Sequence, residues 1–182
     1  GYTPVLEEPV VFQLTQDEMH ISIHYYKNVK LTANSASFTY DGTEQGVTGF
    51  TCDTEGTQFD LGRIVAGAQG TQVGEYDAVF DEDPVGLTDM TERYIVTAAH
   101  PGTLTVTPRA VTFKGETATL PYTGSEQEIS GVEAVGLADG QTFELAYSAK
   151  GTLPNADPGY PGSFAGQARI LAADGTDATA NY

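Results

Sequence analysis

Histidine and carboxylate side chains are the groups in this sequence that could bind a metal ion or transfer a proton. His20 and His24 are an even number of residues apart, so they point to the same side of a strand. No third ligand lies near this pair in the sequence, and His100 belongs to a Pro-Gly turn, where we expect it to be solvated. We therefore expect no metal site built on histidine.

Two acidic segments are candidates for cation binding. The densest cluster is Asp81-Glu82-Asp83, and Asp174-Gly175-Thr176-Asp177 resembles part of a calcium loop. Neither segment has the spaced ligands of an EF-hand. Both are predicted to be solvated loops, with weak calcium binding by Asp81, Asp83, Asp174 and Asp177 as the alternative. Ca²⁺ is the one cofactor that the sequence leaves open.

Motifs of nucleophilic catalysis and phosphate binding are absent from the sequence. The chain has neither a G-x-S-x-G elbow nor a G-x-x-x-x-G-K-[ST] loop. Its one cysteine, Cys52, excludes an intramolecular disulfide and a cysteine-rich zinc site. We predict that the protein is not an enzyme.

Strand signals dominate the elements that must carry these residues. The 182 residues include 21 Gly and 9 Pro, which separate short apolar runs. Val29, Leu31 and Ala33 alternate with polar residues, and so do Leu104 and Val106. This period of two predicts antiparallel strands with one buried face. The fold class is therefore all-β, with a single helical turn expected around residues 87–93.

The sequence repeats itself. Residues 40–45, YDGTEQ, align with residues 122–127, YTGSEQ, at an offset of 82, and the offset grows to 88 near the end of the chain. Slow growth of this kind fits two copies of one domain whose loops have gained residues. We predict an N-terminal strand segment at 1–28, taken as a cap or the remnant of a preceding repeat. A first β repeat at 29–108 and a second at 109–182 follow.

The second repeat has no counterpart of the last hairpin of the first repeat, from which we expect the natural polypeptide to continue. Almost no linker separates the repeats, so we expect a stiff, rod-like arrangement. Aromatic residues recur at equivalent positions and are predicted to form a shared core. These pairs are Tyr40 and Tyr122, Tyr76 and Tyr160, Phe80 and Phe164, and Tyr94 and Tyr182.

A covalent cross-link is a second chemical possibility. Some surface domains of Gram-positive bacteria join a strand lysine to an asparagine, and Lys114 and Asn181 lie near the two ends of the second repeat. The first repeat has Arg93 where the second has Asn181, which weakens the case.

Residues 120–124, LPYTG, match the sortase pentapeptide L-P-x-T-G. A sortase signal continues with a membrane-length apolar run and a basic tail, whereas 58 acidic, domain-like residues follow Gly124. Tyr122 also aligns with Tyr40 at a strand-to-turn position. We therefore interpret the match as coincidence.

The net charge of −17 disfavours nucleic acid and anionic membrane surfaces as partners, because no cluster of Lys or Arg reverses it locally. No stretch approaches the roughly 18 apolar residues of a membrane helix, so we predict no membrane insertion in this fragment. Solubility is the simplest consequence of the acidity.

Three segments carry a family resemblance: LTANSASFTYDGTEQ, QVGEYDAVF and DMTERYIVTAAHPGTLTVTPR. In this order they resemble the tandem YDG or MBG-type repeats of large bacterial surface proteins and adhesins. The resemblance implies an extracellular protein at the bacterial cell surface, with no catalytic residues. It implies a stalk, a spacer or an adhesive module for host glycans or extracellular proteins, monomeric within a longer multi-repeat chain.

The fold within the all-β class stays open at this point. An Ig-like β-sandwich fits about seven short strands, and a β-grasp-like sheet is the alternative. The rival function is a carbohydrate-binding module of a secreted enzyme, which would stack sugars on exposed tyrosines. Tyr25, Tyr26 and Tyr147 are its candidates.

Overall fold

The computed structural model describes residues 2–4, 25–54, 64–89, 93–154 and 159–182. In these ranges every regular element is a strand, apart from the short 3-10 turn η1 (Thr179–Asn181). The predicted all-β class is confirmed. His20, His24 and the rest of residues 5–24 in the predicted N-terminal strand segment lie outside the described residues.

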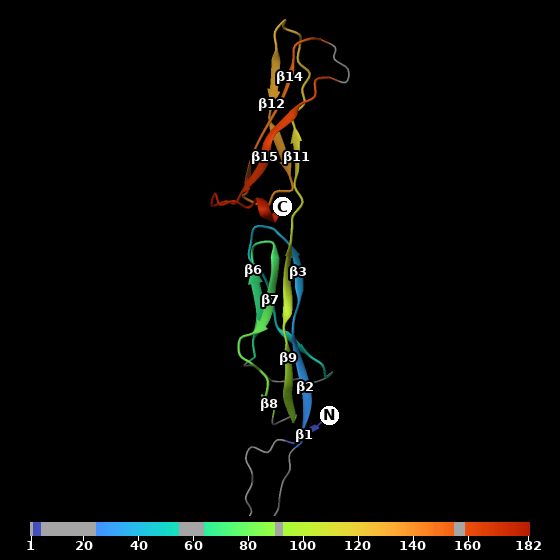
Figure 1. Ribbon diagram of the computed structural model, residues 1–182, viewed down its shortest axis with the longest axis vertical. Coiled ribbons are helices and arrows are strands. Elements are labelled where there is room, and N and C mark those ends of the chain that lie inside the picture. The colour runs from blue at the N-terminus through green and yellow to red at the C-terminus, as the bar shows by residue number, and fades with distance from the viewer. Residues whose placement is uncertain (1, 5–24, 55–63, 90–92, 155–158) are drawn as a thin grey trace, which may run out of the picture. The chain divides into compact units, whose positions relative to one another are not determined.

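The first part of the chain forms two sheets (Figure 1). In one sheet the strand order is β1-β2-β9-β8, and β5 pairs with residues 31–33 of β2. In the other, the order is β3-β10-β7-β6-β4. The strands are β1 (Tyr2–Pro4), β2 (Tyr25–Ala33), β3 (Ala36–Thr39), β4 (Gln45–Thr48), β5 (Phe50–Cys52), β6 (Ala66–Gly70), β7 (Gly74–Phe80), β8 (Thr88–Asp89), β9 (Tyr94–His100) and β10 (Gly102–Thr107).

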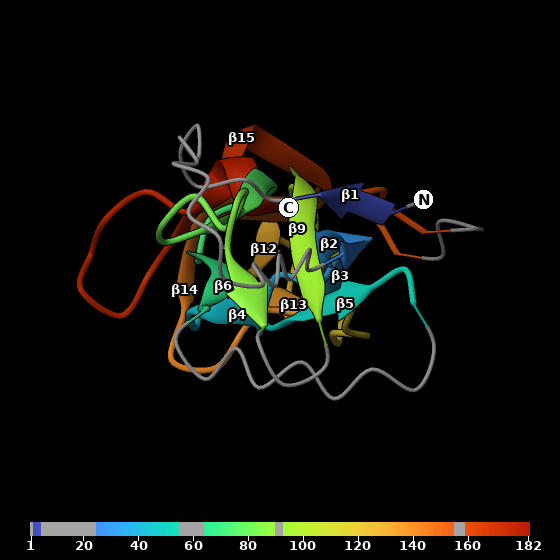
Figure 2. The same cartoon turned by 90° about the horizontal axis from the view of Figure 1, so that it is seen from below.

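Parallel pairing joins β2 to β9, which lie side by side in Figures 1 and 2. The predicted alternation holds in β2, where Val29, Leu31 and Ala33 are buried, and in β10, where Leu104 and Val106 are buried. All of these side chains except Val106 belong to two apolar clusters. Cluster A contains Ala33, Val47, Ala66, Ala78 and Leu104, and cluster B contains Val29, Leu31 and Val96.

The second part of the chain forms smaller sheets. One pairs β11 (Thr112–Gly115) with β13 (Val132–Val135), and the other has the order β12-β14-β15. The remaining strands are β12 (Gln127–Ser130), β14 (Thr142–Gly151) and β15 (Ser163–Leu171). No residue of β11 to β14 is buried, and Ile170 is the buried residue of β15.

The strand register repeats between the two parts. Leu31 pairs with Cys52 in β2 and β5, and Phe113 pairs with Ala134 in β11 and β13, so each partner has moved by 82 positions. In β4 and β6, Gln45 pairs with Gly70, and in β12 and β14, Gln127 pairs with Gly151. β11, β12, β13 and β14 therefore correspond to β2, β4, β5 and β6.

Two compact units make up the chain. Unit 1 contains residues 1–36, 45–70 and 75–105, and unit 2 contains residues 37–44, 71–74 and 106–182. Unit 2 thus includes short segments that the sequence places in the first repeat. β2 is continuous from Tyr25, across the predicted boundary at residue 28. The repeat boundaries themselves stay predictions, as do the Ig-like and β-grasp alternatives.

The expected helical turn at 87–93 is only partly described. Thr88 and Asp89 form the strand β8 rather than a helical turn, and residues 90–92 lie outside the described residues. The sheet pairs Thr88 with Ile95 of β9.

Candidate functional site

The aromatic positions of the two repeats have different surroundings. Tyr40 is 2% exposed, whereas Tyr122 at the same position of the second repeat is 60% exposed. Tyr160 and Phe164 are also exposed, at 40% and 45%. The prediction of a shared aromatic core is therefore wrong for Tyr122, Tyr160 and Phe164.

Tyr40 is buried by residues of the following repeat that belong with it to unit 2. Its ring meets the ring of Tyr182 edge-on at a centroid distance of 5.7 Å. Its hydroxyl accepts a 2.7 Å hydrogen bond from Gln141 Nε2, and Gln141 Oε1 accepts one from Tyr182. We call the contacts of Tyr40 with Gln141 and Tyr182 the joint. The periodicity of a single repeat could not reveal them.

The second repeat has an open side. In the described part of residues 109–182, no strand corresponds to β9 or β10. Among the described residues β11 has β13 as its one strand partner. β15 pairs with β14, and its last residue, Leu171, also forms a bridge to Asp177. Residues 116–123, which align with the segment that contains β3, form no strand.

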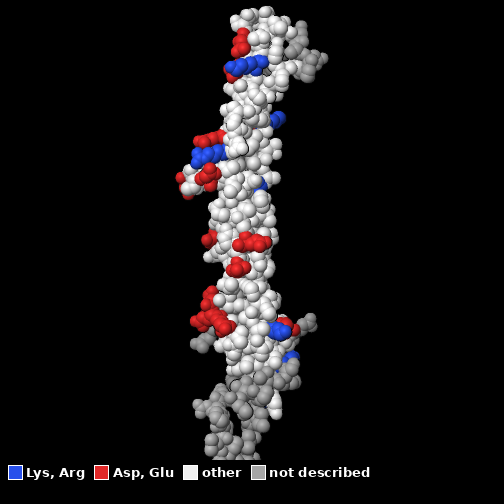
Figure 3. All heavy atoms as spheres, in the orientation of Figure 1, with Lys and Arg blue, Asp and Glu red and all other residues white. Residues whose placement is uncertain are grey.

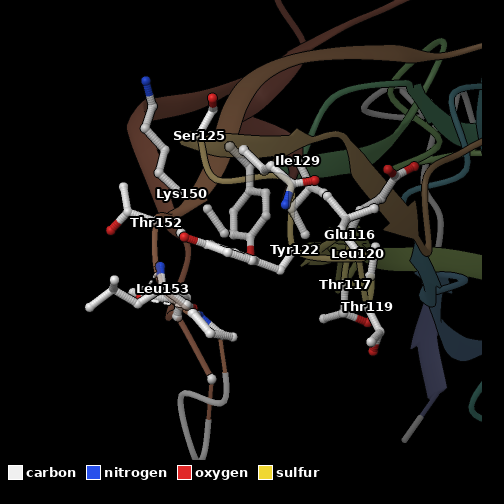
Figure 4. A pocket seen from close by; sticks show the side chains of 18 residues that line it. Glu116, Thr117, Thr119, Leu120, Tyr122, Ser125, Ile129, Lys150, Thr152 and Leu153 are labelled. Carbon is white, nitrogen blue, oxygen red and sulfur yellow. Dashed lines mark hydrogen bonds between the residues drawn. The ribbon is translucent and has the colours of Figure 1, made fainter.

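A groove of about 670 Å³ occupies this open side. Figure 4 shows its labelled residues 116–120 on one side and residues 150–153 on the other, with Tyr122 between them. Ile129, Tyr147 and Ala149 contribute to its lining from β12 and β14. Leu120 and Leu153 are exposed along it. The groove is the main candidate site among the described residues.

Three lining residues stand at positions that form the core in the first repeat. The strand pairings align Ile129 with Val47, and Ala149 with Ala68. The pair Tyr147 and Phe164 likewise matches the pair Ala66 and Phe80. Val47 and Ala66 are buried members of cluster A, whereas Ile129 and Tyr147 are only half-buried. The groove therefore lies at the position that cluster A has in the first repeat, and no strand among the described residues covers it.

Glycines accommodate the aromatic rings of the groove. A Cβ at Gly115 or Gly162 would collide with the ring of Tyr147, and a Cβ at Gly151 would collide with the ring of Tyr160. The Tyr160 hydroxyl also accepts a 2.9 Å hydrogen bond from the backbone N of Leu153. Both rings are held in place and present apolar surface to the groove.

Charge is sparse in the groove. Lys150 forms ion pairs with Glu126 and Glu128, at 3.9 and 3.2 Å between its Nζ and their carboxylate oxygens. These side chains are about half exposed, so each pair contributes little to stability. On the face drawn in Figure 3 the charges form separate clusters, and much of the surface is uncharged. The groove lining combines aromatic rings with polar side chains such as Thr117, Thr119 and Gln127.

The predicted cation ligands serve local turns instead. Asp83 Oδ1 accepts a hydrogen bond from Val85 N, and Asp174 Oδ1 accepts hydrogen bonds from Thr176 N and Oγ1. The Thr176 bonds lower the pKa of Asp174. Asp81 belongs to no cluster of possible metal ligands among the described residues. Within the described ranges no three His, Cys, Asp or Glu side chains gather as a metal site would require.

Asp177 is the most strongly engaged of these carboxylates. Its Oδ1 accepts a 2.9 Å hydrogen bond from Thr179 N, and its Oδ2 accepts a 3.0 Å bond from Arg169 Nε. Hydrogen bonding to Thr179, and then to Arg169, lowers the pKa of Asp177 to about 2. In the segment that resembles a calcium loop, the Asp177 carboxylate is therefore bound by Thr179 of η1 and Arg169 of β15.

The predicted sugar-stacking tyrosines do not form one site. Tyr25 is 52% exposed on β2, and its neighbour Tyr26 is buried at 6% exposure, so the Tyr26 ring is not accessible to a sugar. Tyr147 lies in the groove, in another unit. Tyr122 and Tyr160 also line the groove, although the repeat alignment predicts both as core residues.

The proposed cross-link partners have other neighbours. Lys114 lies on the exposed face of β11, where it pairs in register with Glu133. Asn181 is buried, its Nδ2 donates to Gln72 Oε1 at 2.7 Å, and its Oδ1 accepts from Val73 N at 2.9 Å. Both the nitrogen and the oxygen of the Asn181 side-chain amide therefore already form hydrogen bonds.

Cys52 is a half-buried free thiol on β5, packed against cluster B. In the ranges that the structure describes, no helix has the length and apolar character needed to cross a membrane. Comparisons with protein-family models, with curated proteins and with solved structures found no match for this chain.

Proposed function

We propose that this chain is a non-catalytic part of a secreted repeat protein of the bacterial cell surface, of the YDG/MBG type. Its repeats act as a stalk or spacer, or as an adhesive module. The resemblance of the three sequence segments supports the family and the extracellular location. The joint around Tyr40 is the observation that carries the mechanical role.

The joint supports a stiff connection because it uses three kinds of contact. Tyr40 packs on Tyr182. Asn181 is buried and binds Gln72 and Val73. Arg109 Nε donates a 2.6 Å hydrogen bond to the carbonyl oxygen of Gly136, and Arg109 Nη1 reaches the carbonyl oxygen of Tyr40 at 3.5 Å. In tandem-repeat proteins, contacts between neighbouring repeats contribute to stability, and a spacer depends on them.

The experiment that tests this role is ¹⁵N relaxation of the whole chain. We expect the two repeats to tumble as one body, and the Tyr40→Ala variant to tumble as two, because it removes the ring that packs on Tyr182. Tyr25→Ala is the matched control, since Tyr25 is an exposed tyrosine of β2. Independent tumbling of the repeats in the unaltered chain would contradict the spacer role.

The surface location has its own test. Antibodies raised against this chain should label intact cells of the source bacterium without permeabilisation. Labelling that appears only after the cells are broken would contradict the extracellular part of the proposal.

Carbohydrate binding is the second candidate function. The observation that favours it is the groove, where Tyr122 and Tyr160 are exposed and Tyr147 is half-buried. Exposed tyrosines provide apolar ring faces with a polar hydroxyl. A glycan and mucin screen, with and without calcium, tests it, and Tyr122→Ala should abolish any specific signal while Tyr25→Ala keeps it.

A further inference from the structure

Two strands from the start and the end of the first repeat run in the same direction. β2 pairs in parallel with β9, from Lys27 opposite Tyr94 to Thr32 opposite His100, with one register shift after Val29. The two strands lie side by side in Figures 1 and 2. Because the pairing is parallel, the start of β2 and the end of β9 lie at opposite ends of the paired segment.

The same direction continues in the strands that follow. A Cβ on Gly102 would collide with the carbonyl oxygens of Ala33 and Asn34, and Thr103 N donates a 3.0 Å hydrogen bond to Ser35 Oγ. The residue numbers rise together in these contacts, and β10 is a neighbour of β3 in its sheet. β10 therefore leads away from β9 in the direction in which β3 leads away from β2.

Apolar side chains shield the paired segment from water. Val29 and Leu31 of β2 are completely buried and Val96 of β9 is 1% exposed, and together they form cluster B. Thr97 Oγ1 adds a 3.2 Å hydrogen bond to the carbonyl oxygen of Val29, at the register shift. Water that is excluded from a ladder cannot replace its hydrogen bonds one at a time, so each broken bond leaves an unsatisfied buried group.

Both strands are also held on their outer edges. On β2, Asp53 N donates a 3.1 Å hydrogen bond to the carbonyl oxygen of Lys30, and Lys30 N donates a 2.9 Å bond to Asp53 Oδ1. On β9, Val96 N donates to the carbonyl oxygen of Leu87, and Gly86 N donates to the carbonyl oxygen of Val96, both at 2.9 Å. Neither strand can therefore peel away from the sheet without further losses.

This arrangement determines how the first repeat responds to tension. A pull that enters at the start of β2 and leaves at the end of β10 acts along the two strands in opposite directions. The ladder between β2 and β9 is then loaded in shear, and its hydrogen bonds must break together. Pulling the neighbouring ends of the same strands apart would break the bonds one after another. The unfolding rate under force depends on this barrier.

We propose that the pairing of β2 with β9 is a force-bearing clamp, which resists extension of the chain between β2 and β10. The clamp lies within unit 1, and it is shear of the whole ladder that gives it strength. This inference deepens the proposed stalk role, and the use of the clamp in the cell rests on that role. The clamp itself is a property of the first repeat alone.

The experiment is single-molecule force spectroscopy of the whole chain, with handles attached to introduced cysteines in a Cys52→Ser background. Tyr25→Cys with Ala110→Cys loads the clamp in shear, and both positions are exposed. Tyr25→Cys with Arg93→Cys is the matched control. Arg93 is exposed and its carbonyl oxygen accepts a 2.8 Å hydrogen bond from Lys27 N, so this pair pulls neighbouring strand ends apart. We expect a higher unfolding force for the first pair, at equal stability without force.

A pair of core variants separates mechanical from thermodynamic stability. Val29→Ala removes two methyl groups from the clamp, and Val47→Ala removes the same groups from cluster A on β4. Both residues are buried, so both variants should lower the free energy of unfolding. We expect Val29→Ala to lower the unfolding force between positions 25 and 110 more than Val47→Ala does, because its contacts are lost when the clamp yields.

Two outcomes would overturn the proposal. The first is an unfolding force between positions 25 and 110 that is no higher than the force between positions 25 and 93. The second is a loss of force in the Val47→Ala variant as large as the loss in the Val29→Ala variant. Neither result would decide the stalk role, which the relaxation and labelling experiments test separately. Independent tumbling of the repeats would in turn leave the clamp unaffected.

Discussion

The two repeats share their strand register but bury their side chains to different extents. Leu31 and Phe113 have equivalent partners, as do Gln45 and Gln127. Yet the first repeat contains clusters A and B, whereas no residue of β11 to β14 is buried. The pairing of neighbouring strands therefore does not create a core in this fold. The core forms when β9 and β10 close the two sheets.

Tyr40 and Tyr122 extend the comparison to the ends of the repeats. The same position is buried at one and exposed at the other, because Tyr182 and Gln141 of the following repeat cover Tyr40. Residues of the second repeat thus bury a residue of the first repeat. Three predictions follow for this contrast.

The largest expected effect concerns the closing strand. Leu104→Ala should lower the free energy of unfolding of the first repeat by about 2–5 kcal/mol, because it leaves a cavity in cluster A. Ile129→Ala should cost about 1 kcal/mol in the second repeat, since Ile129 is only half-buried. Denaturant-dependent hydrogen exchange, read separately for each repeat, measures both. Equal losses of unfolding free energy for the two variants would contradict the expected difference between the repeats.

A smaller effect is expected at the joint. Tyr40→Phe removes the hydroxyl that accepts from Gln141, so it should cost about 1 kcal/mol. Tyr122→Phe should change the free energy of unfolding by less than about 0.5 kcal/mol, because Tyr122 is exposed. Equilibrium denaturation of the two variants provides the measurement, and a comparable loss for Tyr122→Phe would show that the two positions are not different in kind.

The smallest expected effect is a pH dependence confined to the second repeat. The pKa of Asp177 is lowered from 3.8 to about 2, so its carboxylate contributes stability that is complete above about pH 4. That contribution is lost as the pH falls from about 4 to 2, because protonation removes the bonds to Thr179 and Arg169. A carboxyl NMR titration should find the low pKa in the unaltered chain.

Variants separate the two causes of this shift. Arg169→Gln should raise the pKa of Asp177 only in part, because hydrogen bonding to Thr179 is the larger cause. Asp177→Asn should flatten the acid limb of the stability curve of the second repeat. A titration midpoint of Asp177 near 3.8 in the unaltered chain would be incompatible with the hydrogen bonds described.

Much of the fold could be predicted from the chain. The period-two patterns at Val29 and Leu104 are local, and each strand depends mainly on its own alternation, so the all-β class and the buried faces of β2 and β10 are confirmed. The candidate site was harder to predict. The repeat alignment predicts Tyr122 and Tyr160 as core residues, because they align with Tyr40 and Tyr76. Tyr147 is predicted as a sugar-stacking residue because it is not one of the aligned aromatic residues.

The amino-acid sequence by itself determined the strands, the repeat and the turn positions, because alternation and glycine placement act over a few residues. Only the tertiary structure decided the burial of residues such as Tyr40 and Tyr122, because it depends on residues far away in the chain. Tyr40 is buried by residues about a hundred positions later in the sequence, as the hydrogen bond to Gln141 shows. Tyr122 has the same local sequence signal and remains open to solvent.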